Sequence, residues 1–311
     1  MPYPIEKKLV VAVSTNALFN LENEDSIFKL DGLEAFKRYQ EQNNGKILER
    51  GLAFPFIRRF LNINKEYQKE NPVEVVLLSK NNPDISIRIF NSIRNYDLDI
   101  TRAAFTSGES PFSYIPAFNV SLFLSTNEED VMSAITNGFA AGRILNTKIT
   151  DDLTDNELRV AFDFDGVIAD DESEKIYKEH GQLDIFHNHE TVNKDKPLNP
   201  GPLADFFKKL AFFQKMEEKK KEKDSNYKKI VKTSIITARN APAHERALNT
   251  LKSWNVEVDE MYLLGGIEKK RVLEVHKPHI FFDDQISHLD PTLTDIPLVH
   301  IPFGISNSKK T

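Results

Sequence analysis

The sequence predicts an α/β fold built from two tandem domains, each a parallel sheet covered by helices. Apolar runs rich in β-branched residues alternate along the chain with segments of helical spacing, which is the order that parallel sheets require. The length of 311 residues suits about two domains. The hydrophobic fraction of 40% and the charged fraction of 28% are those of a soluble globular protein.

The first half of the chain contains the expected elements in alternating order. Strands are expected where apolar residues run without a break until a polar residue, and helices where apolar residues recur every three or four positions. The segments are, in order, a strand at residues 8–14, a helix at 22–42, an apolar set at 53–62, a strand at 73–78, a helix at 84–96 and a strand at 118–124. Serine follows several of these strands, so hydroxyl groups are expected along one sheet edge.

The second half repeats the order of the first half, which predicts an internal duplication. Residues 160–169 match residues 11–20 at a distance of 149 positions. Two further matches share a distance of 158 positions, 235–240 with 77–82 and 280–285 with 122–127. The same distance of 158 positions in two widely separated segments favours a true repeat. The alternative is that the segments resemble each other only in strand composition. A turn-rich seam at residues 142–156 separates the expected domains 1–150 and 151–311.

The two halves differ most at their strand ends, where acids of the second half face neutral residues of the first. The pairs are Asp163 with Ser14, Asp165 with Asn16, Asp283 with Ser125 and Asp284 with Thr126. Thr237 keeps a hydroxyl partner in Ser79, and Lys269 faces Pro111. The sequence therefore predicts one half with cation-binding carboxylates and one half without them.

The acids of the second half follow buried strands, and parallel strands bring their carboxyl ends to one edge of the sheet. Clustered carboxylate oxygens are ligands for a divalent cation, here Mg²⁺. One carboxylate can attack an electrophile while another moves protons. The hydroxyl of Thr237, the lysine after a two-glycine loop at Lys269 and the start of a helix would bind an anion. Together these groups predict a site for phosphate and Mg²⁺.

These segments resemble the four motifs of the haloacid dehalogenase superfamily of phosphatases. Asp163-Phe164-Asp165 is similar to the first motif, Thr237 to the second, Lys269 to the third and Asp283-Asp284 to the fourth. The wider chain resembles the cytosolic 5′-nucleotidase type I family over nearly its full length. The segments that carry this resemblance are AVSTNALF (12–19), FTSGESP (105–111), AFNVSLFL (117–124), DDESE (170–174) and HIFFDDQ (279–285). Phe164 departs from the family pattern.

The resemblance implies two Rossmann-like domains, the second haloacid-dehalogenase-like with a small helical cap inserted at about residues 168–231. It implies hydrolysis of nucleoside 5′-monophosphates to nucleoside and phosphate with Mg²⁺. The implied catalytic residues are the nucleophile Asp163, the acid and base Asp165, Thr237 and Lys269. The implied phosphate contacts are Gly166, Thr237, Ala238, Arg239 and Lys269, and the implied metal ligands are Asp163, Asp165, Asp283 and Asp284.

Several parts of the sequence leave two interpretations open. The first half either binds a nucleotide, with Lys80 among the contacts, or only supports the catalytic half. The resemblance implies a nucleoside diphosphate as the effector. Aromatic residues between 206 and 213 form either a cap surface or, as we expect for most of them, ordinary helix core. Arg239 contacts either phosphate or ribose, or it forms an ion pair on a helix surface.

Charge and composition argue against several function classes. The formal net charge of −6 predicts no broad attraction to nucleic acid or to anionic membranes. The charge run at residues 215–223 is expected to be a solvated helix or a mobile loop. The absence of cysteine excludes disulfides and thiolate metal sites. No stretch has the length of a membrane span, and we expect a cytoplasmic protein. His187 and His189 are expected at the surface rather than on a metal.

Two rival functions stay open at this point. One is a phosphatase of the same superfamily that acts on sugar phosphates or other small phosphoesters. The other is a nucleotide-binding regulator that has lost turnover, against which the complete acid set at Asp163, Asp165 and Asp283 argues. The sequence leaves base preference open, and also whether the chain forms a homo-oligomer.

Overall fold

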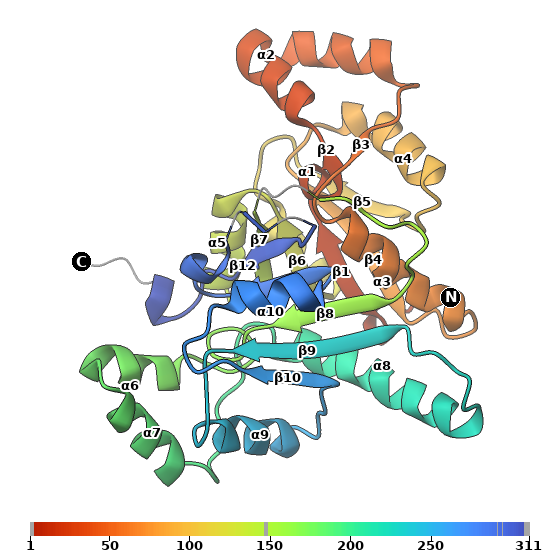
Figure 1. Ribbon diagram of the computed structural model, residues 1–311. Coiled ribbons are helices and arrows are strands. Elements are labelled where there is room, and N and C mark those ends of the chain that lie inside the picture. The colour runs from red at the N-terminus through yellow and green to blue at the C-terminus, as the bar shows by residue number, and fades with distance from the viewer. Residues whose placement is uncertain (1–2, 146–148, 291, 294, 308–311) are drawn as a thin grey trace. The chain divides into compact units, whose positions relative to one another are not determined.

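The computed structural model describes residues 3–145, 149–290, 292–293 and 295–307, and the chain divides into two compact units (Figure 1). Unit 1 is Met1–Phe139 and unit 2 is Ala140–Thr311. The division falls earlier than residue 150 because residues 141–144 form a strand that pairs with the last strand of unit 2. Residues 146–148 of the expected seam lie outside the described residues. Both units combine parallel strands with helices, which confirms the α/β class.

Unit 1 contains a parallel sheet in the order β6-β1-β4-β5. Its strands are β1 (Leu9–Val13), β4 (Val73–Ser79), β5 (Arg102–Phe105) and β6 (Val120–Ser125), and a small antiparallel pair joins β2 (Phe19–Asn20) to β3 (Glu49–Arg50). Its helices are α1 (Thr15–Leu18), α2 (Glu22–Asn43), α3 (Phe54–Glu66), α4 (Ser86–Asn95) and α5 (Glu128–Thr136). All residues of β1 and β4 are buried, and both strands are apolar apart from Glu74 and Ser79 of β4.

Helix α2 is broken at Gly32, although the sequence predicted one helix over residues 22–42. Gly32 has φ 79° and ψ −176°, a conformation that glycine adopts without a steric clash. Phe36 after the break is buried, whereas Phe28 and Leu33 are 51% and 41% exposed. These apolar side chains line a cavity of unit 1.

Unit 2 contains parallel strands in the order β10-β9-β8-β11-β12, with β7 antiparallel to β12. Its strands are β7 (Ala141–Ile144), β8 (Leu158–Phe162), β9 (Val231–Thr237), β10 (Glu260–Leu263), β11 (Ile280–Asp283) and β12 (Leu298–His300). Its helices are α6 (Glu172–His180), α7 (Leu183–Val192), α8 (Ala204–Lys223), α9 (His244–Ser253) and α10 (Lys269–His276). The strand order reverses between β8 and β11, so a ligand crevice is expected at their carboxyl ends.

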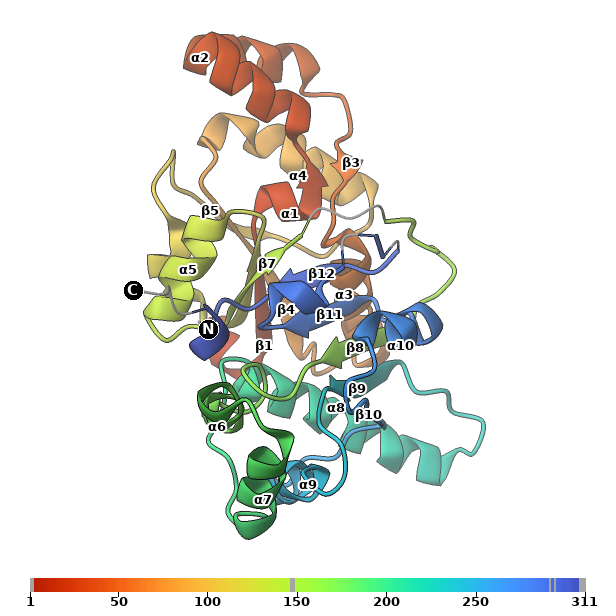
Figure 2. The same ribbon diagram turned by 60° about the vertical axis from the view of Figure 1, so that its left-hand side comes forward.

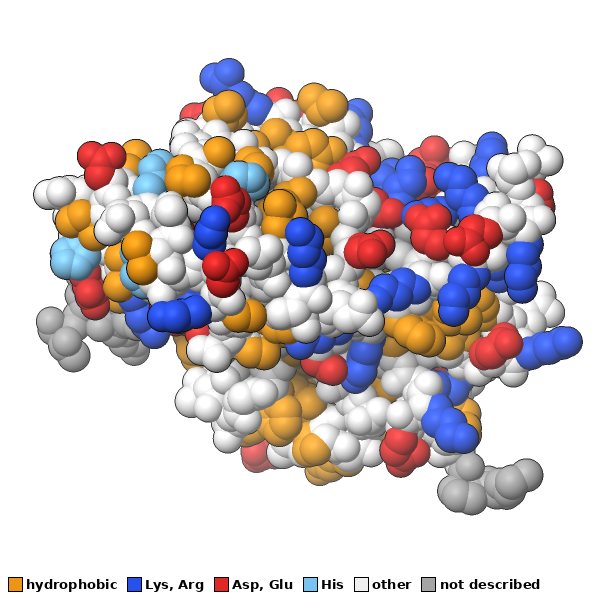
Figure 3. Space-filling model, turned by 90° about the horizontal axis from the view of Figure 1, so that it is seen from below, with side chains coloured by type: hydrophobic (Ala, Val, Ile, Leu, Met, Phe, Trp, Pro, Cys, Tyr) orange, Lys and Arg blue, Asp and Glu red, His pale blue; other side chains and the backbone are white. Residues whose placement is uncertain are grey.

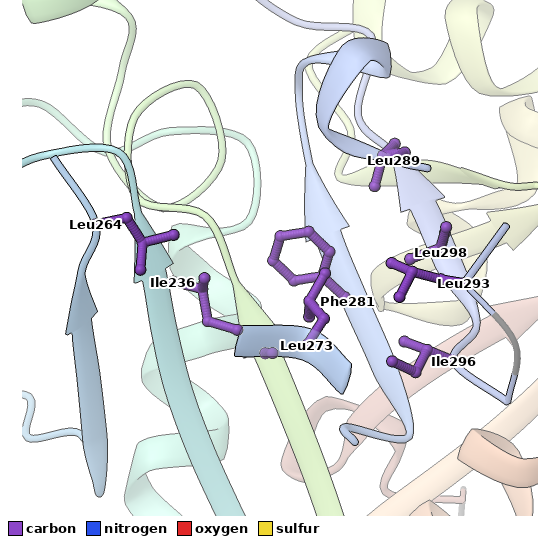
Figure 4. Packing of buried hydrophobic residues seen from close by; sticks show 9 residues of the cluster. Ile236, Leu264, Leu273, Phe281, Leu289, Leu293, Ile296 and Leu298 are labelled. Atoms are coloured by element: carbon purple, nitrogen blue, oxygen red, sulfur yellow. The ribbon is translucent and has the colours of Figure 1, made fainter. Parts of the chain in front are cut away.

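Helices cover both faces of the unit 2 sheet. Phe206 and Phe207 of α8 pack against Phe162, and Phe206 also contacts Phe282. The opposite face carries an apolar cluster that includes Leu273 of α10 (Figure 4). Its buried members are Ala161, Ile236, Leu264, Leu273, Phe281, Leu289, Leu293, Ile296 and Leu298. Neighbouring residues of β11 serve the two faces because successive side chains of a strand alternate.

Helix α8 is mainly a core helix, as expected for its aromatic residues. Phe206, Phe207 and Phe213 are buried, and Phe212 is 61% exposed. The charge run continues α8 to Lys223, and most of it is solvated. Glu217 is the exception, because it is buried and accepts hydrogen bonds from two backbone N–H groups at the start of β9. Figure 3 shows acidic and basic side chains interspersed over the visible face.

Helices α6 and α7 pack against each other within unit 2 (Figures 1 and 2). They occupy the part of the chain between β8 and α8 where a cap was expected, whereas α8 belongs to the sheet-covering layer. Among the described residues, no helix is both long enough and apolar enough to cross a membrane.

A buried hydroxyl holds the same backbone position in both units. In unit 1, the Leu48 N–H donates to Ser92 Oγ at 2.9 Å. In unit 2, the Leu198 N–H donates to Thr250 Oγ1 at 3.0 Å. Each hydroxyl also donates to the backbone carbonyl four residues before it. The hydroxyl residues are 158 positions apart and the leucines 150.

A buried arginine repeats in the same way. Arg88 Nε donates to the Lys46 carbonyl at 2.9 Å in unit 1. Arg246 Nε donates to the Lys196 carbonyl at 2.9 Å in unit 2. Like the hydroxyls, the arginines are 158 positions apart and their acceptors 150. The two units therefore share internal contacts as well as the order of four strands, and these positions provide a residue-by-residue correspondence.

Candidate active site

A cavity of about 350 Å³ lies at the carboxyl ends of the unit 2 strands. Five predicted site residues line it, namely Asp163, Asp165, Thr237, Ala238 and Arg239. Asp163 follows β8, Thr237 ends β9, and Ala238 and Arg239 continue from it into the next loop. The cavity therefore lies at the expected sheet edge.

Lys269 joins two predicted carboxylates, of which Asp163 lines this cavity. Its Nζ lies 2.7 Å from Asp163 Oδ2 and 2.6 Å from Asp283 Oδ2. All three side chains are nearly or fully buried. The Asp163 N–H also donates to the Phe282 carbonyl at 2.8 Å, which ties the end of β8 to β11. The structure thus brings together residues that are far apart in the sequence.

Burial and neighbouring charges shift the pKa of each group in this cluster. Burial raises the pKa of Asp163 to about 7, although Lys269 acts in the opposite direction. Burial alone would raise the pKa of Asp283, but Lys269 and His288 hold it below its ordinary value. Burial alone would lower the pKa of Lys269, but the two aspartates raise it. The lysine is therefore charged and offsets part of the negative charge.

Asp284 is fully buried, and neither of its carboxylate oxygens has a hydrogen-bond partner. Burial, followed by the charges of Asp163 and Asp283, raises its pKa to about 10. A Cβ placed on Gly166 would come within 2.6 Å of the Asp284 carboxyl group, and Gly166 has a φ of 73°. Glycine is thus required at this position for the aspartate to fit. Its contact is with Asp284, and it does not line the cavity.

The donor set fits a hard divalent cation. Asp163, Asp283 and His288 each offer an atom within 4.8 Å of the others. The unpartnered oxygens of Asp284 add donors beside them, and buried carboxylates without partners are costly unless a cation or proton neutralises them. Asp163 and Asp283, with Asp284 as a further buried carboxylate outside the cluster, are therefore the residues that would hold a divalent cation. His288, whose Nδ1 lies 3.2 Å from Asp283 Oδ1, was not predicted.

Asp165 points to a different partner. Arg239 Nε and Nη2 donate to its two carboxylate oxygens, each at 2.7 Å. Its carboxylate is not part of the donor cluster found among the described residues. A contact between the metal and Asp165, which the resemblance implied, stays a prediction.

Arg239 is fully engaged by groups of the protein. Besides Asp165, it donates to Glu190 of α7, to the Ala243 carbonyl at 3.0 Å and to Ser173 Oγ at 2.8 Å. These bonds use all five N–H groups of a guanidinium. Burial would lower the pKa of Arg239, but Asp165 and Glu190 raise it. No donor is left for phosphate in this arrangement, and the ion pair is buried rather than on a helix surface.

Glu190 connects Arg239 to the rest of unit 2. It is fully buried and also accepts from Arg246 Nη1 at 3.0 Å and from Ser173 Oγ at 2.9 Å. Burial would raise the pKa of Glu190, but Arg239 and Arg246 hold it below its ordinary value. Glu190 of α7 thus holds Arg239 in place, and Arg239 in turn orients the carboxylate of Asp165. Neither histidine of α7 joins a metal cluster among the described residues, and both are partly buried.

The remaining cavity walls come from α6, α7 and two loops. Tyr177, Leu183 and Phe186 form an apolar wall, and Gly265 with Gly266 lies in the loop after β10. Thr237 Oγ1 accepts from the Arg239 N–H at 3.2 Å, and the Thr237 side chain is buried. The Phe164 ring does not line the cavity, because it is buried 5.3 Å below the guanidinium of Arg239. The cavity therefore joins a charged floor to an apolar side.

Comparison with known proteins gives the family of the chain. A family model described as 5′-nucleotidase matches residues 1–308. The chain belongs to the 5′-nucleotidase family. The human protein named cytosolic 5′-nucleotidase 1B is 35% identical to this 5′-nucleotidase family chain over 297 residues. The match covers 93% of the chain and 48% of that protein, so the chain spans about half the length of this curated relative. No solved structure matches.

Membership of the 5′-nucleotidase family confirms the resemblance found in the sequence. Sequence reasoning missed the residues that hold the predicted ones in place, above all His288 and Glu190. His288 was detectable as a titratable side chain soon after the fourth motif. Glu190 carries no motif, because its role depends on packing between α7 and the loop after β9.

Proposed function

We propose that this chain is a Mg²⁺-dependent 5′-nucleotidase that hydrolyses nucleoside 5′-monophosphates to nucleoside and phosphate. The observation that carries the proposal is the buried set of Asp163, Lys269 and Asp283, of which Asp163 lines a cavity with an apolar wall. The matching family model supports the reaction class. The repeated hydrogen bonds and strand order support two Rossmann-like domains that arose by duplication, the second haloacid-dehalogenase-like with α6 and α7 as its cap.

Asp163 is the proposed nucleophile. Its carboxylate attacks phosphorus, the bond between phosphorus and the 5′-oxygen breaks, and an aspartyl-phosphate forms on Asp163. Lys269 and the Thr237 hydroxyl bind the non-reacting phosphate oxygens, with the backbone N–H of Ala238 as a further donor. The Gly166 N–H donates to the Asp170 carbonyl at 3.3 Å, so Gly166 is not assigned this role. A bound Mg²⁺ would offset the repulsion between the anionic nucleophile and the anionic substrate.

Asp165 is the proposed acid and base. It protonates the departing 5′-oxygen and then takes a proton from the water that cleaves the aspartyl-phosphate. Arg239 donates hydrogen bonds to both carboxylate oxygens of Asp165, which fixes the orientation of this carboxylate. We therefore assign Arg239 as a positioning residue of Asp165 rather than a phosphate ligand.

The nucleoside is proposed to lie against Tyr177, Leu183 and Phe186. An aromatic ring over a base contributes about 1–3 kcal/mol without selecting one base, which suits a nucleoside better than a sugar phosphate. A nucleoside diphosphate effector, cytoplasmic localisation and a homo-oligomer stay predictions that the described contacts do not address.

The test is a phosphate-release panel with Mg²⁺ and with chelator. Nucleoside 5′-monophosphates are expected to exceed sugar phosphates and other small phosphoesters, and chelator is expected to remove the activity. Equal or higher rates with sugar phosphates would establish the rival phosphatase. Release of no phosphate from the whole panel would establish the silent regulator. Mg²⁺ is also expected to raise the melting temperature of the wild-type chain but not of Asp283→Asn, a readout independent of turnover.

A further inference from the structure

Unit 1 contains a second cavity, of about 610 Å³, at the carboxyl ends of its own strands. Its floor includes Ser14 after β1, Ser79 at the end of β4 and Ser125 at the end of β6. Ligands of open α/β sheets bind at this edge. The cavity is larger than that of unit 2 and lies wholly within unit 1.

The apolar wall of this cavity corresponds to that of the unit 2 cavity. Phe28 and Tyr177 are 149 positions apart, and two further pairs are 150 apart, Leu33 with Leu183 and Phe36 with Phe186. All six side chains line their respective cavities. The change from 149 to 150 falls after Gly32 and Gly181, and the repeated backbone contacts beyond this point also keep 150. An apolar wall for a flat ring is thus present twice.

The floor of the unit 1 cavity has lost the groups that handle phosphate in unit 2. Ser14 stands where unit 2 has Asp163, and Asn81 stands where it has Arg239. The position of Lys269 is held by Pro111, so the buried ammonium group is missing as well. The acidic metal cluster found among the described residues belongs to unit 2. Hydroxyl and amide groups remain, and these bind sugar hydroxyls and base edges without a metal.

The charges that do line the unit 1 cavity offset one another. Lys80 Nζ lies 3.0 Å from Asp130 Oδ1, so its charge is already paired. Lys29 and Asp25 also line the cavity, and their opposite charges attract each other. Asp25 also accepts a hydrogen bond from Asn16 Nδ2 at 2.7 Å. A phosphate entering this cavity would meet no net positive charge, so the lining favours an uncharged ligand.

From these observations we propose that the unit 1 cavity binds an uncharged nucleoside without a metal ion. The choice of a nucleoside rests on the proposed function, because it takes the apolar wall of unit 2 as the wall that holds the substrate's nucleoside part. The proposal disfavours the phosphate-binding role that the sequence suggested for Lys80. Unit 1 would then bind the nucleoside product of the reaction proposed for unit 2, rather than its nucleoside monophosphate substrate.

The test uses the full chain in excess chelator, with inosine and adenosine as ligands in isothermal titration calorimetry. Leu33→Asp places a charge on the unit 1 wall at a half-exposed position that tolerates it. Leu183→Asp is the matched change in unit 2. Nucleoside binding is expected to persist in Leu183→Asp and to weaken by about tenfold or more when Leu33→Asp is added, because the new charge loses hydration against the ligand. Phe28→Ala in the Leu183→Asp background is expected to weaken binding less.

Two results would overturn the proposal. One is the loss of all nucleoside binding in Leu183→Asp, which would leave unit 1 without a site. The other is tighter binding of a nucleoside diphosphate than of the nucleoside to Leu183→Asp in chelator, which would make the unit 1 cavity an anion site. Neither result depends on turnover. A failure of the proposed enzymatic function would appear instead in the phosphate-release panel.

Discussion

In unit 1, Ser14 follows β1 and its hydroxyl accepts a hydrogen bond from the Ala17 N–H at the start of a short helix. In unit 2, Asp163 holds the corresponding position, and its carboxylate meets Lys269 instead. The backbone N–H of each residue donates to the neighbouring strand at 2.8 Å. The same backbone therefore carries a cap in one unit and a candidate nucleophile in the other. The difference assigns the proposed chemistry to a few strand-end side chains on a shared backbone.

The sharpest way to break this comparison is to make the end of β8 neutral. Asp163→Asn is expected to lower phosphate release by roughly 10⁴-fold or more, because no nucleophile remains. Steady-state phosphate release measures it. Asp205→Asn, which removes a largely exposed carboxylate from α8, is the control that keeps normal turnover. Near-normal turnover in Asp163→Asn would remove this residue from the mechanism.

A second change tests whether Arg239 positions the base. Arg239→Lys cannot reproduce the paired contact with Asp165, so hydrolysis of the aspartyl-phosphate is expected to slow by about 10²-fold. The intermediate should then accumulate, and acid quenching with phosphate-labelled substrate detects it. A purely structural role would lower turnover without accumulation. Glu190→Gln, which weakens the ion pair between Glu190 and Arg239, is expected to lower turnover as well, but by less.

The smallest expected effect tests the framework that the two units share. Ser92→Ala and Thr250→Ala each leave one buried backbone N–H without its acceptor. Each is expected to destabilise its own unit by about 1–3 kcal/mol. Native-state amide exchange, read separately for β1 and β8, measures the two losses. Thr250→Ser keeps the hydroxyl and is the control. A loss in one unit alone would show that the shared contacts differ in weight.

Sequence reasoning predicted the elements whose apolar runs are continuous. It placed Asp163 and Asp283 at neighbouring strand ends because parallel topology brings such ends together. It also expected most aromatic residues of α8 in the core, where Phe206 and Phe207 lie. It did not identify short strands such as β12, because three residues carry little periodicity.

The partners of the site residues were beyond sequence reasoning for a physical reason. Arg239 was expected to contact substrate or to form an ion pair on a helix surface, yet it is buried between Asp165 and Glu190. Glu190 lies 49 positions before Arg239, and nothing in the spacing joins them. Such contacts depend on how α7 packs. For the same reason, Lys269 was predicted at the site but not its place between two aspartates.

Gly166 and Asp284 constrain each other, and this constraint applies to related sequences as well. A single added carbon atom at Gly166 would collide with the Asp284 carboxyl group. The corresponding positions of unit 1 are Ala17 and Thr126, so the glycine and the acid are both replaced there. A relative that keeps the aspartate but carries a side chain at the glycine position would have to rearrange this loop. In an alignment of many sequences, the residues at these two positions would therefore distinguish domains that keep the catalytic arrangement from domains that have lost it.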